Sequence, residues 1–169
     1  DRAEEHLRGA LDLLRDLWGP GHPRASRALV SLGIMAGDRG DFDEARELLS
    51  TAAKSLEEHL GPRHPERLAV WTYLARVEQL AGELDRAEEM LERATADLRE
   101  QTGGSDPRLA GAIDQWGNLL SVRGRHDEAE PLLKEALAMR RGLYGKSHPE
   151  VAESLEHMGL LYVRRGQDE

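Results

Sequence analysis

The stretch from Gly124 to Tyr162 reads GRHDEAEPLLKEALAMRRGLYGKSHPEVAESLEHMGLLY, and the rest of the chain repeats its pattern. The glycine that opens it belongs to a series spaced 42 residues apart: Gly40, Gly82, Gly124 and Gly166. A second series has the same spacing: Gly19, Gly61, Gly103 and Gly145. A fixed period between about 20 and 50 residues is the signature of a stacked-repeat protein. The sequence therefore predicts a repeat architecture before any local pattern is considered.

Each period contains two helical patterns. In the first full period, the first helix is predicted from about Pro23 to Asp38 and the second from about Phe42 to Leu60. Small or apolar residues recur at helical spacing in both helices: Leu29, Leu32, Gly33 and Ala36, then Ala45, Leu49, Ala52 and Leu56. Each apolar stripe is too narrow to stabilise an isolated helix, so neighbouring helices must cover it.

The loops carry signals for the ends of helices. The first helices are predicted to end at Gly40, Gly82 and Gly124, since a left-handed residue at this position favours glycine. Each first helix is predicted to begin with a proline. The residue immediately before that proline is His22, His64, Asp106 or His148. Because Asp106 shares this column, we expect these side chains to accept helix-capping hydrogen bonds. A zinc site is not expected, because equivalent loops lie about 8–10 Å apart whereas zinc ligands lie about 2 Å from the ion.

Composition excludes several classes of function. The chain has 169 residues, a formal net charge of −9 and no cysteine. The negative charge argues against a nucleic-acid partner, and the lack of cysteine excludes a disulfide or a thiolate site. No apolar run reaches the length that a membrane-spanning helix needs, and no signal-peptide pattern precedes the repeats. We expect a cytoplasmic protein without a membrane partner. Because the chain opens on Asp1, we also expect an excised or processed piece.

The repeated columns resemble the tetratricopeptide repeat, whose pattern is W-x2-L-G-x2-Y followed by A-x3-F. The first-helix half appears as Trp71-x2-Leu74-Ala75, Ile113-x2-Trp116-Gly117-x2-Leu120 and Leu155-x2-Met158-Gly159-x2-Tyr162. The second-helix half appears as Ala45-x3-Leu49, Ala87-x3-Leu91 and Ala129-x3-Leu133. The usual tetratricopeptide period is about 34 residues. The longer 42-residue period of this chain resembles that of the repeats of kinesin light chains. That subtype also occurs in many bacterial proteins.

The paired asparagines frequent in the first helices of kinesin light chains are absent here. Their columns hold Val30–Ser31, Thr72–Tyr73, Asp114–Gln115 and Glu156–His157. The cargo specificity of kinesin light chains is therefore not expected.

Period and resemblance together predict an all-α, right-handed solenoid of antiparallel helix pairs, as a single array over residues 1–169. Residues 1–18 match a second helix alone, 19–60, 61–102 and 103–144 are full periods, and 145–169 hold a final first helix. We count seven helices. The terminal helices lack the polar caps that solenoids normally need, which predicts a fragment of a longer array. Isolated chains are then expected to stack head to tail.

No pattern in the sequence supports catalysis. Neighbouring carboxylates such as Glu88–Glu89 have basic residues nearby, as expected of an ion-paired helix surface. Serine, histidine and aspartate are present without a nucleophile motif, and the glycines do not cluster into a phosphate loop. We therefore expect no enzymatic activity, no cofactor and no metal. The three tryptophans lie on or beside packing columns, so we expect them in the core.

The resemblance implies that the first helices line a concave groove. Its expected exposed columns lie one before, one after and five after the column of Trp71. The residues on this face that we predict to contact a ligand are Val30, Ile34, Thr72, Arg76, Gln79, Asp114, Asn118, Ser121, Glu156 and Leu160. The expected function is a non-catalytic scaffold that binds a protein or peptide there. The alternative is a sensor or regulatory array of a larger signalling protein, attached to an ATPase, protease or kinase domain.

Overall fold

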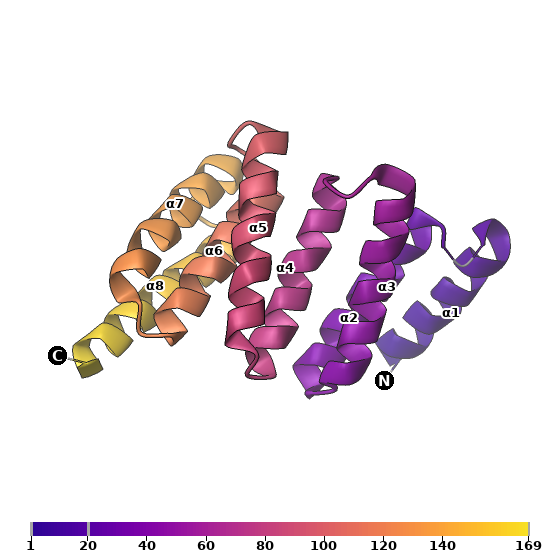
Figure 1. Cartoon of the computed structure of the whole chain (residues 1–169), viewed down its shortest axis with the longest axis horizontal. Coiled ribbons are helices and arrows are strands. Elements are labelled where there is room, and N and C mark those ends of the chain that lie inside the picture. Colours follow the sequence, from indigo (N-terminus) through magenta and orange to yellow (C-terminus); the bar gives the residue numbers. More distant parts are fainter. Residues whose placement is uncertain (1, 20, 169) are drawn as a thin grey trace. The chain divides into compact units, whose positions relative to one another are not determined.

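The computed structural model describes residues 2–19 and 21–168, with the backbone alone at 167 and 168, and all its regular structure is helical (Figure 1). The helices, in chain order, are α1 (Arg2–Trp18), α2 (Pro23–Arg39), α3 (Phe42–Leu60), α4 (Pro65–Leu80), α5 (Leu84–Thr102), α6 (Pro107–Val122), α7 (His126–Tyr144) and α8 (Pro149–Asp168). None of these helices is both long and apolar enough to cross a membrane.

The described residues form eight helices, so the expected count of seven is wrong. One unpaired helix, three pairs and one final helix already require eight, and the error lay in the count, not in the layout. The predicted bounds of α3 are those observed, and α2 ends one residue later than predicted. The outermost ends of the predicted segments, at residues 1 and 169, lie outside the described residues.

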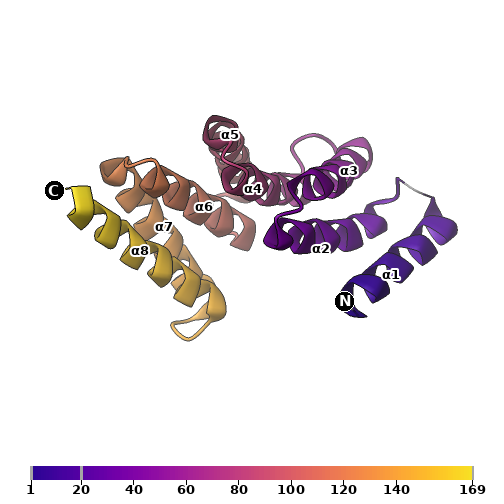
Figure 2. The same cartoon turned by 90° about the horizontal axis from the view of Figure 1, so that it is seen from below.

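The chain divides into two compact units, Asp1–Glu83 with α1 to α4 and Leu84–Glu169 with α5 to α8. In the first unit, α2 packs against α1 and α3, and α3 packs against α4. In the second, α6 packs against α5 and α7, and α7 packs against α8 (Figure 2). The boundary between the units falls inside the predicted period 61–102, between its two helices.

The predicted helix caps are present. The imidazole Nδ1 atoms of His22, His64 and His148 accept hydrogen bonds from backbone N–H groups two residues later, at 3.2, 3.3 and 3.3 Å. Asp106 accepts the equivalent bond from the N–H of Arg108 at 2.8 Å. Hydrogen bonds from the Arg108 side chain lower the pKa of Asp106, which keeps this cap ionised. The capping role expected for this column is therefore confirmed.

The core is built on columns predicted from the repeat, but the expectation that all three tryptophans lie in it is wrong: Trp18 is exposed, and Trp71 and Trp116 are half-buried. On the second helices, Ala45, Leu49, Ala52 and Leu56 of α3 are all buried, as are Ala87, Leu91, Ala94 and Leu98 of α5. Two first-helix glycines permit close helix contact. A Cβ added to Gly33 would lie 2.7 Å from Cγ of Leu49, and one added to Gly117 would lie 2.8 Å from Cγ of Leu133. The leucine therefore fills the space that a side chain would take.

A buried carboxylate lies within the apolar columns of the first unit. Glu78 on α4 is fully buried, although Ala36 occupies the same column one period earlier. Its Oε2 atom accepts hydrogen bonds from Nε and Nη2 of Arg46 on α3, at 3.1 and 2.9 Å. Two hydrogen bonds from the guanidinium to this one oxygen partly compensate for the loss of water around the carboxylate.

Candidate partner-binding face

On the first unit, the predicted groove residues lie on α2 and α4. Val30, Ile34, Arg76 and Gln79 are half-buried. A small hollow forms where these two helices meet, and its lining consists of Ile34, Gly37, Asp38, Tyr73, Arg76, Val77 and Leu80. The hollow therefore brings together two predicted residues, Ile34 and Arg76, with two exposed side chains that the prediction missed, Tyr73 and Leu80.

Arg76 supplies a positive charge at this hollow. Its Nη2 atom donates a hydrogen bond to Oδ1 of Asp38 at 3.0 Å, which links α4 to α2. The side chains of Arg76 and Asp38 are 42% and 54% exposed. An exposed pair of this kind is weak, at roughly 0–1 kcal/mol, so an incoming carboxylate could compete for the guanidinium.

Thr72 does not belong to the exposed face. Its side chain is buried, and its Oγ1 atom donates a hydrogen bond to the backbone carbonyl of Ala69 at 2.7 Å. The expectation that this column is exposed is therefore wrong at Thr72, because the hydroxyl folds back onto its own helix.

On the second unit, three predicted groove residues reach the surface at least in part. Glu156 and Leu160 of α8 are exposed, and Asn118 of α6 is half-buried. The Oδ1 atom of Asn118 is shielded from water and has no hydrogen-bond partner among the described residues. A buried acceptor without a partner is costly, so this atom is a local weak point of α6.

Asp114 was predicted to be exposed, and it is completely buried. Its Oδ1 accepts a hydrogen bond from the Ser154 hydroxyl at 2.7 Å, and its Oδ2 lies 2.7 Å from Nδ1 of His157. The buried guanidinium of Arg140 lies 3.3 Å from Oδ2 and also donates to Ser154 at 2.8 Å. The expectation of exposure is wrong because Asp114 neutralises a charge inside the second unit.

Ser121 is buried as well, so the expectation of exposure is also wrong there. Its hydroxyl oxygen accepts a hydrogen bond from Nη1 of Arg164 on α8 at 3.0 Å. As with Asp114, a polar residue of α6 is covered by the neighbouring first helix of the same unit.

The second unit thus brings a serine, a histidine and an aspartate together, but not as a nucleophile and its base. The hydroxyl of Ser154 donates to the carboxylate of Asp114, and the imidazole of His157 contacts the same carboxylate. A catalytic serine would instead donate to the imidazole that removes its proton. The geometry is that of a buried ion pair with its hydrogen bonds satisfied.

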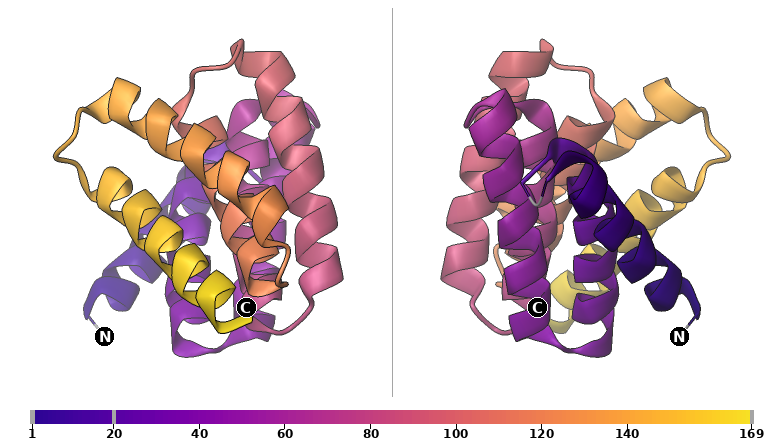
Figure 3. Two further views of the ribbon diagram at one scale, coloured as in Figure 1. Left: turned by 90° about the vertical axis from the view of Figure 1, so that its left-hand side faces the viewer. Right: turned by 90° about the vertical axis from the view of Figure 1, so that its right-hand side faces the viewer.

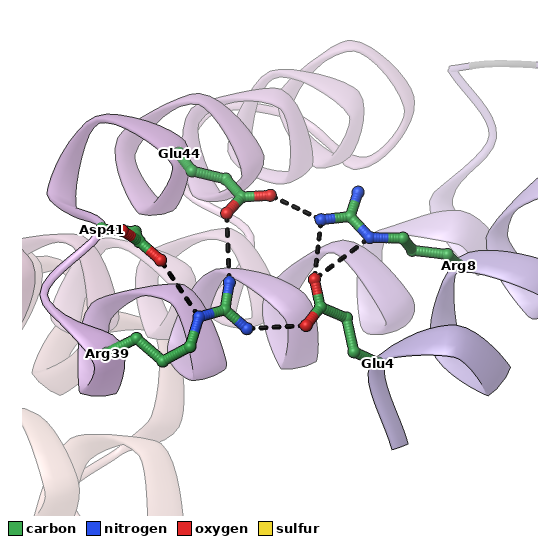
Figure 4. A network of polar contacts seen from close by, with 5 residues as sticks. All are labelled: Glu4, Arg8, Arg39, Asp41 and Glu44. Atoms are coloured by element: carbon green, nitrogen blue, oxygen red, sulfur yellow. Dashed lines mark hydrogen bonds and ion pairs between the residues drawn. The ribbon is translucent and has the colours of Figure 1, made fainter. Parts of the chain in front are cut away.

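An ion-pair network at the start of the chain joins α1, α2 and α3, and the sequence analysis did not identify it (Figure 4). Glu4 accepts from Arg8 at 2.8 Å and from Arg39 at 2.7 Å. Arg39 also contacts Asp41 and Glu44, at 3.0 and 3.2 Å, and Arg8 reaches Glu44 at 2.6 Å. The hydrogen bond from Arg8 is the main reason that the pKa of Glu4 is lowered.

The pairing of Glu4 with Arg39 recurs in the second unit at the same spacing. The equivalent pairs are Glu88 with Arg123 and Glu130 with Arg165. Each joins the first turns of a second helix to the end of the next first helix. Comparing charges column by column across the 42-residue period would have revealed this pairing.

The carboxylate of Glu130 allows a prediction about pH. Hydrogen bonds from Lys134, Arg165 and the Tyr162 hydroxyl lower its pKa from 4.5 to about 2. Because the pKa is depressed in the folded state, its stabilising contribution is complete above about pH 5 and is lost as the pH falls towards 2. We expect Glu130→Gln to lower the urea midpoint at neutral pH, and this difference from the unmodified chain should shrink on acidification. A difference that does not change with pH would contradict the assignment.

The antiparallel helix pairs and their 42-residue period define a helical-repeat scaffold. The tetratricopeptide repeat family matches residues 1–58, 27–100 and 109–169, and the chain belongs to this family. Its repeats are of the kinesin light chain type. Tetratricopeptide repeats in general mediate protein–protein interactions.

Solved structures with the same fold support this assignment. The chain is 25% identical to a candidate kinesin light chain of nearly identical TPR-like repeats from Podosopora anserina, with 98% of this chain and 79% of that chain covered and a TM-score of 0.69. A variant of that protein gives 24% identity, coverage of 98% and 78%, and a TM-score of 0.71. BtubC (BKLC) from P. vanneervenii gives 21% identity, coverage of 97% and 68%, and a TM-score of 0.78. No curated protein matches the chain.

Proposed function

We propose that the chain is a non-catalytic scaffold that binds an extended peptide or a partner helix on the face formed by its first helices. The observation that carries this proposal is the hollow between α2 and α4, where Arg76 lies beside the exposed side chains of Tyr73 and Leu80. An apolar hollow with a cation at its edge suits a peptide that offers an apolar side chain and a carboxylate. In the second unit, the half-buried Asn118 and the exposed Glu156 and Leu160 lie in the same predicted columns.

The proposal is tested by selecting peptides from a random display library on the purified chain and then measuring their dissociation constants. We expect Arg76→Ala to weaken binding about tenfold or more, because a hydrogen bond to a charged group contributes about 1.5–3 kcal/mol. Asn118→Ala tests the predicted face of the second unit in the same way. The fold should survive the change at Arg76, since only an exposed ion pair is lost.

Lys54→Ala is the matched control, because it removes one positive charge from an exposed position on α3. It should leave the dissociation constants unchanged. If neither Arg76→Ala nor Asn118→Ala weakens any selected peptide, the first-helix face is not the binding surface.

A further inference from the structure

Asp38 and Arg76 form an ion pair at the hollow of the first unit. In this unit α2, α3 and α4 all contact one another (Figure 3). Asp38 lies in the last turn of α2 and Arg76 lies on α4, and both line the hollow beside the apolar side chains of Ile34 and Val77. The carboxylate of Asp38 therefore occupies the place in which a bound peptide would put its own carboxylate.

The packing of two first helices does not require this ion pair. Two periods later in the chain, the equivalent residues are Val122 on α6 and Leu160 on α8, which are both apolar. The helices α6 and α8 nevertheless contact each other, as α2 and α4 do. The ion pair is thus a property of this hollow and not of the repeat.

The guanidinium of Arg76 is only partly used by this contact. A guanidinium has five N–H groups. Among the described residues only Asp38 accepts a hydrogen bond from it, through Nη2 at 3.0 Å. By contrast, Arg46 gives two hydrogen bonds to the fully buried Glu78. Because Asp38 and Arg76 are both about half exposed, water screens their attraction, and another carboxylate can replace Asp38 at little cost.

Asp38 is the one acidic residue among those that line the hollow, and Arg76 is the one basic residue. The exposed Arg27 lies on the same side of α2 as Ile34 and Asp38, since residues three, four and seven apart share one side of a helix. Without Asp38 this surface would be positive, and a positive surface attracts an anionic ligand. Asp38 lowers that attraction and holds the guanidinium at the same time.

We propose that Asp38 is an internal competitor for Arg76. Its carboxylate binds the guanidinium in the free protein and is exchanged for a carboxylate of the bound peptide. This role rests on the proposed function, since it requires that a peptide binds in the hollow. Its consequence is a lower affinity for acidic peptides than the hollow and Arg76 alone would give.

Asp38→Asn tests this proposal, because asparagine keeps the shape of the side chain and removes its charge. The probes are peptides selected from the random display library on the unmodified chain, each synthesised with its acidic residue and again with the corresponding amide. We expect Asp38→Asn to lower the dissociation constant of the acidic form about two- to fivefold and to leave that of the amide form unchanged. In the Arg76→Ala chain, Asp38→Asn should lose most of this effect, because the guanidinium is gone.

Glu58→Gln is the matched control for the loss of one negative charge. Glu58 lies on α3, forms an exposed ion pair with Lys54 and is 55% exposed, against 54% for Asp38. Its substitution should leave the dissociation constants of both peptide forms unchanged. A gain in affinity as large as that of Asp38→Asn would show that net charge alone is responsible, which contradicts the competition.

The remaining outcomes separate this role of Asp38 from the function on which it rests. If Arg76→Ala weakens the acidic peptides and Asp38→Asn does not tighten them, the competition is overturned and the binding face stands. If Asp38→Asn weakens them, Asp38 binds a cationic group of the peptide, which also overturns the competition. If no selected peptide depends on Arg76, the hollow is not the binding site and both proposals fail.

Discussion

Asp114→Ala is expected to lower the free energy of unfolding by about 3–5 kcal/mol, because it leaves a buried positive charge without its buried partner. Arg140 is 3% exposed and lies 3.3 Å from the fully buried Oδ2 of Asp114. Ser154 and His157 would lose their acceptor in the same step. The remaining partners of Arg140, Glu150 and Glu153, are about half exposed and cannot replace a buried anion. Urea denaturation at neutral pH measures the effect.

A second variant separates the charge from the packing. Arg140 occupies the column of Leu56 and Leu98, which are buried leucines. Combining Asp114→Ala with Arg140→Leu should therefore recover most of the lost stability, since an apolar pair often replaces a buried ion pair at no net cost. Asp38→Ala, which removes an exposed ion pair, should cost no more than about 1 kcal/mol. A loss below 1 kcal/mol for Asp114→Ala would show that this network does not stabilise the fold.

The helix ends and the repeat columns could be predicted because they depend on residues close together in the sequence. The cap at His22 and the αL glycine at Gly40 each act on the turn beside them. The apolar columns need only the period of the helix and that of the repeat. These features can therefore be predicted from a single repeat and checked against the other repeats of the chain.

The burial of Asp114 could not be predicted from its own helix, because its partners Ser154 and His157 follow 40 and 43 residues later. The signal lay instead in Arg140, a guanidinium in a column of buried leucines, which requires a buried anion nearby. Glu78 gives the same signal in the first unit, where it forms an ion pair with Arg46. The buried pair with Arg140 removes Asp114 from the candidate binding face.

The predicted binding face was defined by columns of the family, and those columns do not distinguish solvent from a neighbouring first helix. In the first unit, Ile34 and Arg76 line a hollow, while Thr72 bonds to its own helix. Tyr73 and Leu80 line the same hollow from columns that were not predicted to face the groove. Which polar side chains turn inward depends on the particular pairs that two helices form.

Leu133→Ala is expected to cost about 2–5 kcal/mol, because it removes a fully buried side chain and leaves a cavity. Leu133 is 0% exposed and lies in the cluster with Leu120, Ala129 and Leu161, so α6, α7 and α8 all lose contacts. Urea denaturation monitored by circular dichroism measures the loss. Leu132→Ala, at a half-buried neighbouring position on the same helix, is the matched control and should cost less.

The close contact between α6 and α7 predicts how this substitution couples to Gly117. In the unmodified chain, the Cβ of Gly117→Ala would lie 2.8 Å from Cγ and 2.9 Å from Cδ2 of Leu133. Overpacking of this kind costs about 1–3 kcal/mol, against about 1 kcal/mol gained by replacing a helical glycine. In the Leu133→Ala chain both side-chain atoms are gone and only the backbone N of residue 133, 3.2 Å from the added Cβ, stays close, so Gly117→Ala should be less destabilising than in the unmodified chain. A double-mutant cycle measures this difference, and equal effects in the two backgrounds would mean that the helices do not approach as closely as the glycine allows.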